Sequence, residues 1–299
     1  MKLHPECIGC LFDQMVKAFR LLKPDISPSV ILKAQKKVMK FLLENNIENI
    51  SSPIVGKFLY NLVGEMMNVK DPYKKLKHQY NELALEHYNE VKELVKNSED
   101  PVFEAIVVSA LANTIDFASQ HDIDIINDLK QFSPKDLVIN DYPLFKKLLE
   151  KETKLLVLLD NAGEIVFDKI LIEILLSEYP ELEIICAVRA APIINDATIE
   201  DAEYISLTEL VKVIESSYAP GIDFSDITEE FRNYFFEEEC LILSKGQGNF
   251  ETLTGNINTQ KDIRNKDIFY LLKAKCSLME RIFGVEKGSL IFKKRTPEF

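Results

Sequence analysis

The second half of the chain alternates short apolar runs with amphipathic segments from residue 154 onward. Leu155 to Leu159 is an unbroken apolar run, which is typical of a central parallel strand covered on both faces. Further apolar runs predict strands, the last of them at a sheet edge, over residues 183–188, 210–215, 240–243, 268–275 and 288–294. Helical patterns separate most of these runs, so βαβ units and a mostly parallel sheet are predicted, which makes the fold class α/β.

The first half of the chain is helical in pattern. Three shorter helices are predicted over residues 7–64, two of them beginning near a serine and a proline. A longer helix over residues 71–98 interleaves lysines with acids, which favours a solvated face. The segment that follows Pro101 is apolar nearly all round and is predicted to be buried. We therefore predict a helical domain over residues 1–98, connecting helices over 99–150 and an α/β domain over 151–299.

Composition limits the classes of function. The formal charge of −12 and the isoelectric point near 5.0 argue against nucleic-acid or anionic membrane partners. No apolar run approaches the roughly 18 to 20 residues of a membrane span, and the N-terminus does not resemble a signal peptide. We expect a cytoplasmic protein that binds a small molecule. A local basic site for a phosphorylated ligand is compatible with this charge.

The five cysteines are expected to be thiols, because an odd number in a long chain without an export signal does not indicate a disulfide framework. Cys7 and Cys10 have the spacing of a zinc or redox pair. A second pair of soft ligands is missing for zinc, and the motif opens a helix instead of following a strand. Two small buried thiols at a helix start are therefore the favoured interpretation.

Polar side chains follow two of the predicted strands. Asp160 and Asn161 come directly after the first strand, and Gly163 and Glu164 then begin a helix. The second strand ends at Arg189, and its loop contains Asn195 and Asp196. Open α/β sheets bind ligands at the carboxyl edge of their strands, so these groups are expected to converge there. Carboxylate and amide oxygens suit Mg²⁺ or Mn²⁺ better than zinc.

Two later segments bring basic and glycine residues to the same edge. The strand at residues 240–243 leads into Lys245, Gly246, Gly248 and Asn249, whose backbone N–H groups and cation suit a phosphate. This pattern is neither a Walker motif nor G-x-G-x-x-G, so it is weak by itself. Lys275 falls at the end of the next strand. In the buried helix, Asn113 and Asp116 lie three residues apart on one face, either capping neighbouring chain ends or pointing into a site.

Taken in order, DNAGE, PIINDAT, SKGQGNFETL and LLKAKC, with the N-terminal CxxC and the helix ending ANTIDF, resemble the damage-control phosphatases, formerly domain-of-unknown-function family 89. The similarity spans nearly the whole chain and is closest to the stand-alone prokaryotic branch. The resemblance implies a helical N-terminal portion on a Rossmann-like three-layer αβα domain. It also implies a phosphatase that uses a divalent metal, Mn²⁺, Co²⁺, Ni²⁺ or Mg²⁺, on phosphorylated metabolites.

The same resemblance assigns roles to residues. Asp160, Asn161 and Asp196 would hold the metal, and Lys275, or else Lys273, would bind the phosphate. It also directs the Asn113 and Asp116 pair toward the active site. Arg189, Asn195, Lys245, Gly246, Gly248 and Asn249 are further candidates for substrate or phosphate binding.

Hydrolysis of phosphate monoesters is the favoured function, because phosphoryl transfer requires mainly positioning and neutralisation of charge. A metal-activated water is the first choice of nucleophile and Asp160 the second, with Asp116 or Glu164 orienting the water. The alternatives are an S-adenosylmethionine-dependent carboxyl methyltransferase and a non-catalytic binder of a phosphorylated ligand. The substrate, the native metal and the oligomeric state are left open by the sequence.

Overall fold

The computed structural model describes residues 1–112, 137–254 and 263–296, and this part of the chain contains one seven-stranded sheet. Its strands are β1 (Leu137–Asn140), β2 (Lys154–Leu158), β3 (Glu183–Val188), β4 (Lys212–Glu215), β5 (Leu241–Lys245), β6 (Ile268–Lys273) and β7 (Leu290–Lys294). The spatial order is β1-β7-β6-β5-β2-β3-β4, and all neighbours are parallel except β6 and β7. The predicted α/β class with a mostly parallel sheet is confirmed.

The centre of the sheet is β2, which pairs with β3 on one side and β5 on the other. Leu156 of β2 lies opposite Ile185 of β3 and Ile242 of β5, and all three side chains are buried. From β2 the chain first adds β3 and β4 on one side and later β5 and β6 on the other. The order therefore reverses between β2 and β5, which is where doubly wound sheets form a ligand crevice at their carboxyl edge.

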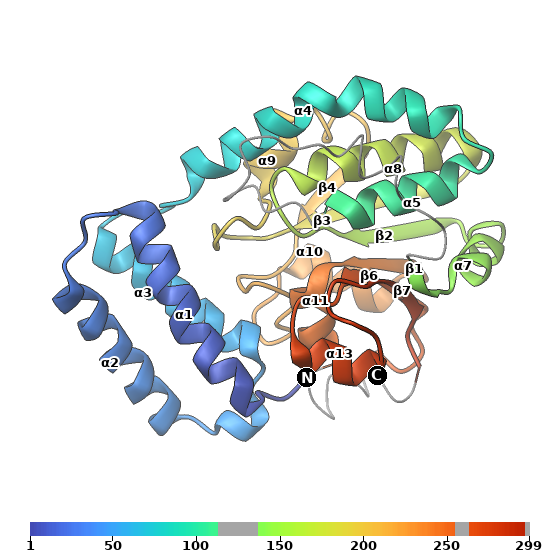
Figure 1. Cartoon of the computed structure of the whole chain (residues 1–299). Coiled ribbons are helices and arrows are strands. Elements are labelled where there is room, and N and C mark those ends of the chain that lie inside the picture. The colour runs from blue at the N-terminus through green and yellow to red at the C-terminus, as the bar shows by residue number, and fades with distance from the viewer. Residues whose placement is uncertain (113–136, 255–262, 297–299) are drawn as a thin grey trace.

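Helices cover both faces of the sheet (Figure 1). Apolar side chains of one face share a core with α4 (Lys74–Lys96), α5 (Pro101–Ala112), α7 (Tyr142–Leu149), α8 (Glu164–Glu178) and α9 (Ile199–Tyr204). The other face shares a core with α10 (Glu229–Arg232), α11 (Gly246–Leu253) and α13 (Ser277–Phe283). This is the expected αβα arrangement. No helix within the described ranges is long and apolar enough to cross a membrane.

The first three helices form a bundle with a core of its own, drawn in blue beside the sheet in Figure 1. They are α1 (Pro5–Leu22), α2 (Pro28–Glu44) and α3 (Ser52–Met67). Met15 and Phe19 of α1 and Leu59 of α3 are fully buried there. Ile193, from the loop after β3, joins the same core. The bundle therefore packs directly on a loop at the carboxyl edge of the sheet.

The structure corrects five expectations from the sequence. The helical bundle consists of α1 to α3, whereas α4 packs mainly on α8 in the core of the α/β part, and only its first turn, at Leu76, also contacts the bundle core. Residues 137–140 form a strand where a connection was predicted, and the last strand, β7, lies between β1 and β6 instead of at an edge. Residues 246–253 form α11 directly after β5. Finally, Lys77 of α4 is only 3% exposed, although a solvated face was predicted for this helix.

Candidate active site

The loops that follow β2 and β3 are joined by backbone hydrogen bonds. The N–H of Ala197 donates to the carbonyl of Asp160 at 2.8 Å, and the N–H of Ala162 donates to the carbonyl of Asn195 at 2.8 Å. Asn161 and Asp196 form an isolated antiparallel bridge between these contacts. The two polar motifs that lie 35 residues apart in the sequence are therefore in contact, as the parallel sheet predicts.

A buried guanidinium lies behind the two aspartates. Arg189, at the end of β3, is 1% exposed and donates from Nε to Asp196 Oδ2 at 2.6 Å and from Nη2 to Asp160 Oδ1 at 3.4 Å. Its Nη1 donates to Asn249 Oδ1 at 2.9 Å. The predicted substrate contacts of Arg189 and Asn249 do not fit this placement, because both side chains are engaged beneath the carboxylates. Arg189, which in turn donates a hydrogen bond to Asn249, instead holds the carboxylates of Asp160 and Asp196 at a fixed separation.

The carboxylates at this site are crowded. Burial first, and then the charges of Glu164 and Asp196, raise the pKa of Asp160 to about 7, although Arg189 and Lys275 act in the opposite direction. Burial also raises the pKa of Asp196, against the effect of Arg189. Arg189 and Lys275 therefore do not fully compensate the negative charge of the buried carboxylates. A further cation beside Asp160 would be favourable.

Gly246 allows the end of β5 to approach Asp160 closely. Its φ is +78°, and a Cβ atom at this position would lie 2.0 Å from Asp160 Oδ2. Gly246 is thus a packing residue next to the carboxylate, while Gly248, two residues further, lines the pocket. The first turn of α11 begins here, so a segment predicted as a loop presents a helix N-terminus to the site.

Lys245 lies in a buried cluster with the carboxylates of Glu164 and Asp168. Its ammonium is 0% exposed and donates to Glu164 Oε1 and Asp168 Oδ1, both at 2.6 Å, and to the carbonyl of Ser109 at 3.1 Å. The predicted phosphate contact of Lys245 is therefore corrected, since all three donors are used inside the protein. Glu164 is likewise 1% exposed, and its Oε2 accepts a hydrogen bond from Asn161 Nδ2 at 3.1 Å.

A pocket of about 430 Å³ lies between the carboxyl edge of the sheet and the helical bundle. The predicted site residues that line it come from four strand ends, and they are Asp160, Asn161, Asn195, Asp196, Gly248 and Lys275. The bundle contributes Gln14 of α1 and Tyr60 of α3, which the sequence did not indicate because neither residue belongs to one of the motifs. Asn113 and Asp116 lie outside the described residues.

The structure separates the two lysines between which the sequence motif left a choice. Lys275 lines the pocket, and its charge acts on the carboxyl group of Asp160. Lys273 is the last residue of β6, and the alkyl chain of this lysine lies near Gly288, in the turn before β7. The position of Lys275 is therefore the one that suits a ligand in this pocket.

All five cysteines are free thiols, as expected. Cys7 is half-buried and Cys10 is exposed, and both line the pocket together with Cys276. The interpretation of the pair as buried thiols is thus corrected for Cys10. Desolvation raises the pKa of both Cys7 and Cys10. Their thiols are consequently less ionised near neutral pH than a cysteine with the ordinary pKa.

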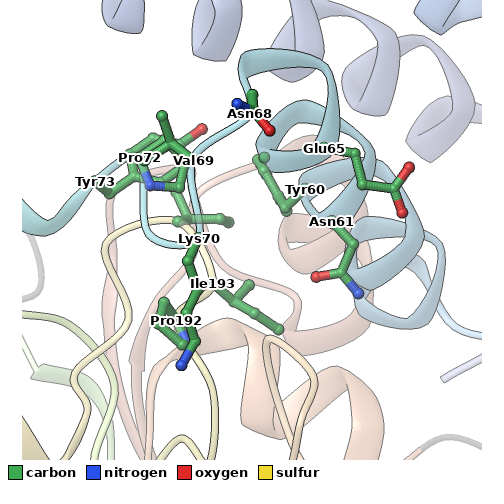
Figure 2. Close-up of a pocket in the computed structure, with 12 residues that line it drawn as sticks. Tyr60, Asn61, Glu65, Asn68, Val69, Lys70, Pro72, Tyr73, Pro192 and Ile193 are labelled. Atoms are coloured by element: carbon green, nitrogen blue, oxygen red, sulfur yellow. The ribbon is translucent and has the colours of Figure 1, made fainter.

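A second pocket of about 460 Å³ adjoins the first (Figure 2). Its walls are the end of α3, the segment 68–73 and the loop 192–194. Tyr60 and Ile194 line both pockets. Ile194 has a φ of +47°, which is unusual for a β-branched residue and indicates backbone strain where the two pockets meet. Asn61, Asn68 and Lys70 give the second pocket polar walls.

The first pocket contains oxygen atoms of the kind that bind a hard metal ion. Within the described residues, no three His, Cys, Asp or Glu side chains are placed to hold one. The predicted set instead combines the carboxylates of Asp160 and Asp196 with an amide. The side-chain hydrogen bonds of Asn161 to described residues both use Nδ2, toward Asp160 and Glu164, so within this part of the chain its Oδ1 is the atom that suits a metal ion. Three oxygens of this kind fit a hard divalent cation that retains water ligands.

A doubly wound sheet with an acidic pocket at its topological switch point places this chain among Rossmann-like α/β proteins. Comparison with known proteins gives the family. Residues 3–291 match the damage-control phosphatase ARMT1-like domain, and the chain belongs to this family. Phosphatase activity is thus its function at the family level.

Similar proteins cover almost the whole chain. A damage-control phosphatase from Archaeoglobus fulgidus is 32% identical over 98% of this chain and 99% of its own length. One from Pyrococcus horikoshii is 31% identical over 97% of both chains. The crystal structure of a DUF89 family protein from Pyrococcus horikoshii, at 28% identity, matches with a TM-score of 0.84 over 99% of this chain and 100% of that one.

Proposed function

We propose that this chain is a divalent-metal-dependent phosphatase that hydrolyses phosphate monoesters of small metabolites, such as sugar phosphates or related damaged metabolites. The observation that carries the proposal is the convergence of Asp160, Asn161, Asp196 and Lys275 on one pocket at the carboxyl edge of the sheet. Two carboxylates and an amide suit a hard cation, and a lysine beside them suits a phosphate oxygen.

Asp160, Asn161 and Asp196 are the proposed ligands of Mn²⁺, Mg²⁺, Co²⁺ or Ni²⁺. When bound, such an ion neutralises charge on the phosphoryl group and lowers the pKa of a coordinated water. Arg189 keeps the two aspartates in place from below, and Glu164 fixes the amide of Asn161. These buried partners orient the ligands, as the outer shell of a metal site does.

Lys275 and the first turn of α11 are the proposed phosphate contacts. Gln247 and Gly248 of that turn line the pocket, and N–H groups at a helix N-terminus favour an anion. Lys275 adds a full positive charge close enough to act on the carboxyl group of Asp160. A phosphate bound between these groups would have its charge neutralised while the acidic side of the pocket holds the cation.

Water is the proposed nucleophile. Both carboxylate oxygens of Asp160 accept hydrogen bonds, Oδ1 from Arg189 and Oδ2 from Asn161. A carboxylate fixed in this way serves as a ligand and is poorly placed to form an aspartyl phosphate. Asp116 stays a predicted water-orienting residue. For the organic part of the substrate, the second pocket offers space and polar walls next to the first.

Removal of metal tests the proposal directly. We expect the purified protein to release phosphate from p-nitrophenyl phosphate and from members of a sugar phosphate panel. EDTA should reduce the rate to background, and added Mn²⁺ should restore it. Phosphate release that EDTA leaves unchanged would contradict the metal-dependent mechanism. Binding without release would support a non-catalytic binder, and methyl transfer from S-adenosylmethionine would support a methyltransferase.

Lys275→Ala should lower kcat/KM for phosphate monoesters by about a hundredfold, because one cation that contacts the phosphate is lost. Lys273→Ala is the matched control, since this lysine does not line the pocket and lies only two residues away. The measurement is steady-state phosphate release at saturating Mn²⁺. Equal effects of the two substitutions would contradict the assignment of Lys275.

A further inference from the structure

Asn81 of α4 connects the two loops that carry the proposed metal ligands. The side chain is 1% exposed and makes one hydrogen bond to Gly163, after the first loop, and one to Asp201, in the helix that follows the second loop. Its Oδ1 accepts from the N–H of Gly163 at 2.6 Å, and its Nδ2 donates to Asp201 Oδ1 at 3.0 Å. One amide therefore satisfies a buried donor and a buried acceptor from segments that are 38 residues apart in the sequence.

The first contact fixes the segment after β2. Gly163 is the N-cap of α8, has a φ of +81° and lies two residues after Asn161. A helix N-terminus leaves its first N–H groups without partners inside the helix. Here the amide oxygen of Asn81, from another helix, binds the N–H of the cap residue itself. The position of Asn161 relative to α4 is thus set by this contact.

The second contact fixes the segment after β3. Asp201 Oδ2 accepts from the N–H of Thr198 at 2.9 Å, which forms a capping box at the start of α9. Thr198 lies two residues after Asp196. Because the other oxygen of Asp201 accepts from Asn81, the loop with Asp196 is joined to the same side chain that holds Gly163.

A buried cation completes this network. Lys77, one helical turn before Asn81, lies 3.1 Å from Asp201 Oδ2 and 3.2 Å from Asp71 Oδ2. Its charge compensates carboxylates that burial would otherwise make costly. Asn81 is therefore part of a compensated cluster and is not an isolated polar group. The cluster lies outside the two pockets described above.

We infer that Asn81 is a positioning residue that, together with the backbone hydrogen bonds between the two loops, fixes the loop of Asn161 relative to the loop of Asp196, and hence tunes the affinity for the divalent cation. The inference rests on the proposed metal ligands. Oxygen ligands must lie within a narrow range of distances from the ion, so a small separation of the two loops weakens binding. Loss of the side chain leaves the Gly163 N–H and one Asp201 oxygen without this partner.

Asn81→Ala should weaken Mn²⁺ binding about tenfold or more, measured by titration calorimetry on the purified protein. Asn89→Ala is the matched control, because Asn89 is an exposed asparagine on the same helix. The Asn89→Ala protein should bind Mn²⁺ with the affinity of the wild type. Unchanged affinity in Asn81→Ala overturns the inference, even if urea unfolding shows a loss of stability. A wild-type protein that binds no divalent cation overturns the metal assignment and this inference with it.

Exchanging the side chains of Asn81 and Asp201 distinguishes a positioning role from a general effect on stability. The exchange also tests the inference if Asn81→Ala does not fold. Asn81→Asp places a second carboxylate against Asp201 and should weaken Mn²⁺ binding at least as much as alanine does. The double variant Asn81→Asp/Asp201→Asn keeps the net charge and again offers a donor opposite an acceptor. Its affinity for Mn²⁺ should return to within about threefold of the wild type. Failure of the double variant to recover affinity contradicts the inference.

Discussion

Asp160→Ala should abolish metal-dependent phosphate release, with kcat lower by about a thousandfold or more. Asp160 is a proposed ligand that accepts a hydrogen bond from Asn161, and it follows the central strand of the sheet. Removing its carboxylate takes away one of three oxygen ligands. It also removes one of the two carboxylates that Arg189 contacts among the described residues, so the guanidinium would be less well compensated.

Asp160→Asn tests the charge of Asp160 separately from its size, because this substitution keeps the shape of the side chain. Burial and two neighbouring carboxylates raise the pKa of Asp160, which means that its charged form destabilises the folded protein. At pH 8 the asparagine variant should therefore be inactive and yet have a higher free energy of unfolding than the metal-free wild type. Phosphate release and urea unfolding measure the two effects. Retained activity would disprove the role of Asp160 as a metal ligand.

The control for this pair of variants is Asp13→Ala. Asp13 is an exposed aspartate of α1 that pairs with Lys17 at 2.8 Å on the surface. Surface ion pairs contribute about 0 to 1 kcal/mol, so this substitution should change stability little. Activity equal to that of the wild type is expected, since Asp13 does not line the pocket.

Lys245→Met should destabilise the protein by about 3 to 5 kcal/mol, the second large effect that the structure predicts. The ammonium is fully buried and binds two carboxylates that are themselves buried, those of Glu164 and Asp168. Methionine has a similar length but no charge, so both carboxylates would lose their cation. Lys147→Met, at an exposed position of α7, should stay within about 0.5 kcal/mol of the wild type.

The loss caused by Lys245→Met should depend on pH. Burial raises the pKa of Asp168 to about 6, even though Lys245 acts to lower it. Without the lysine, that pKa in the folded state rises further above the ordinary value of an unfolded chain. A raised pKa of an acid costs stability as the pH increases through it. The difference in unfolding free energy between variant and wild type should thus be larger at pH 8 than at pH 5.5. Equal differences at the two pH values would contradict this account.

The sequence alone determined the class of fold and predicted where the candidate site lies. Unbroken apolar runs such as Leu155 to Leu159 indicate parallel strands buried on both faces, because such strands leave no solvated side to carry polar residues. Parallel strands end at a common edge, so Asp160, Asn161, Asp196 and Lys275 could be expected together before the structure was known. These conclusions depend on local pattern and on one general rule of topology.

Only the tertiary structure decided which polar residues face the pocket and which lie behind it. Lys245, Arg189 and Asn249 are polar residues that lie at or just after the ends of β3 and β5, as some pocket residues do, but their side chains bind buried partners. Lys77 was predicted to lie on a solvated helix face, and it is buried because α4 packs on the α/β part of the chain. The physical reason is that a side chain's environment depends on which distant helix covers it, and that choice is made by packing across the whole chain.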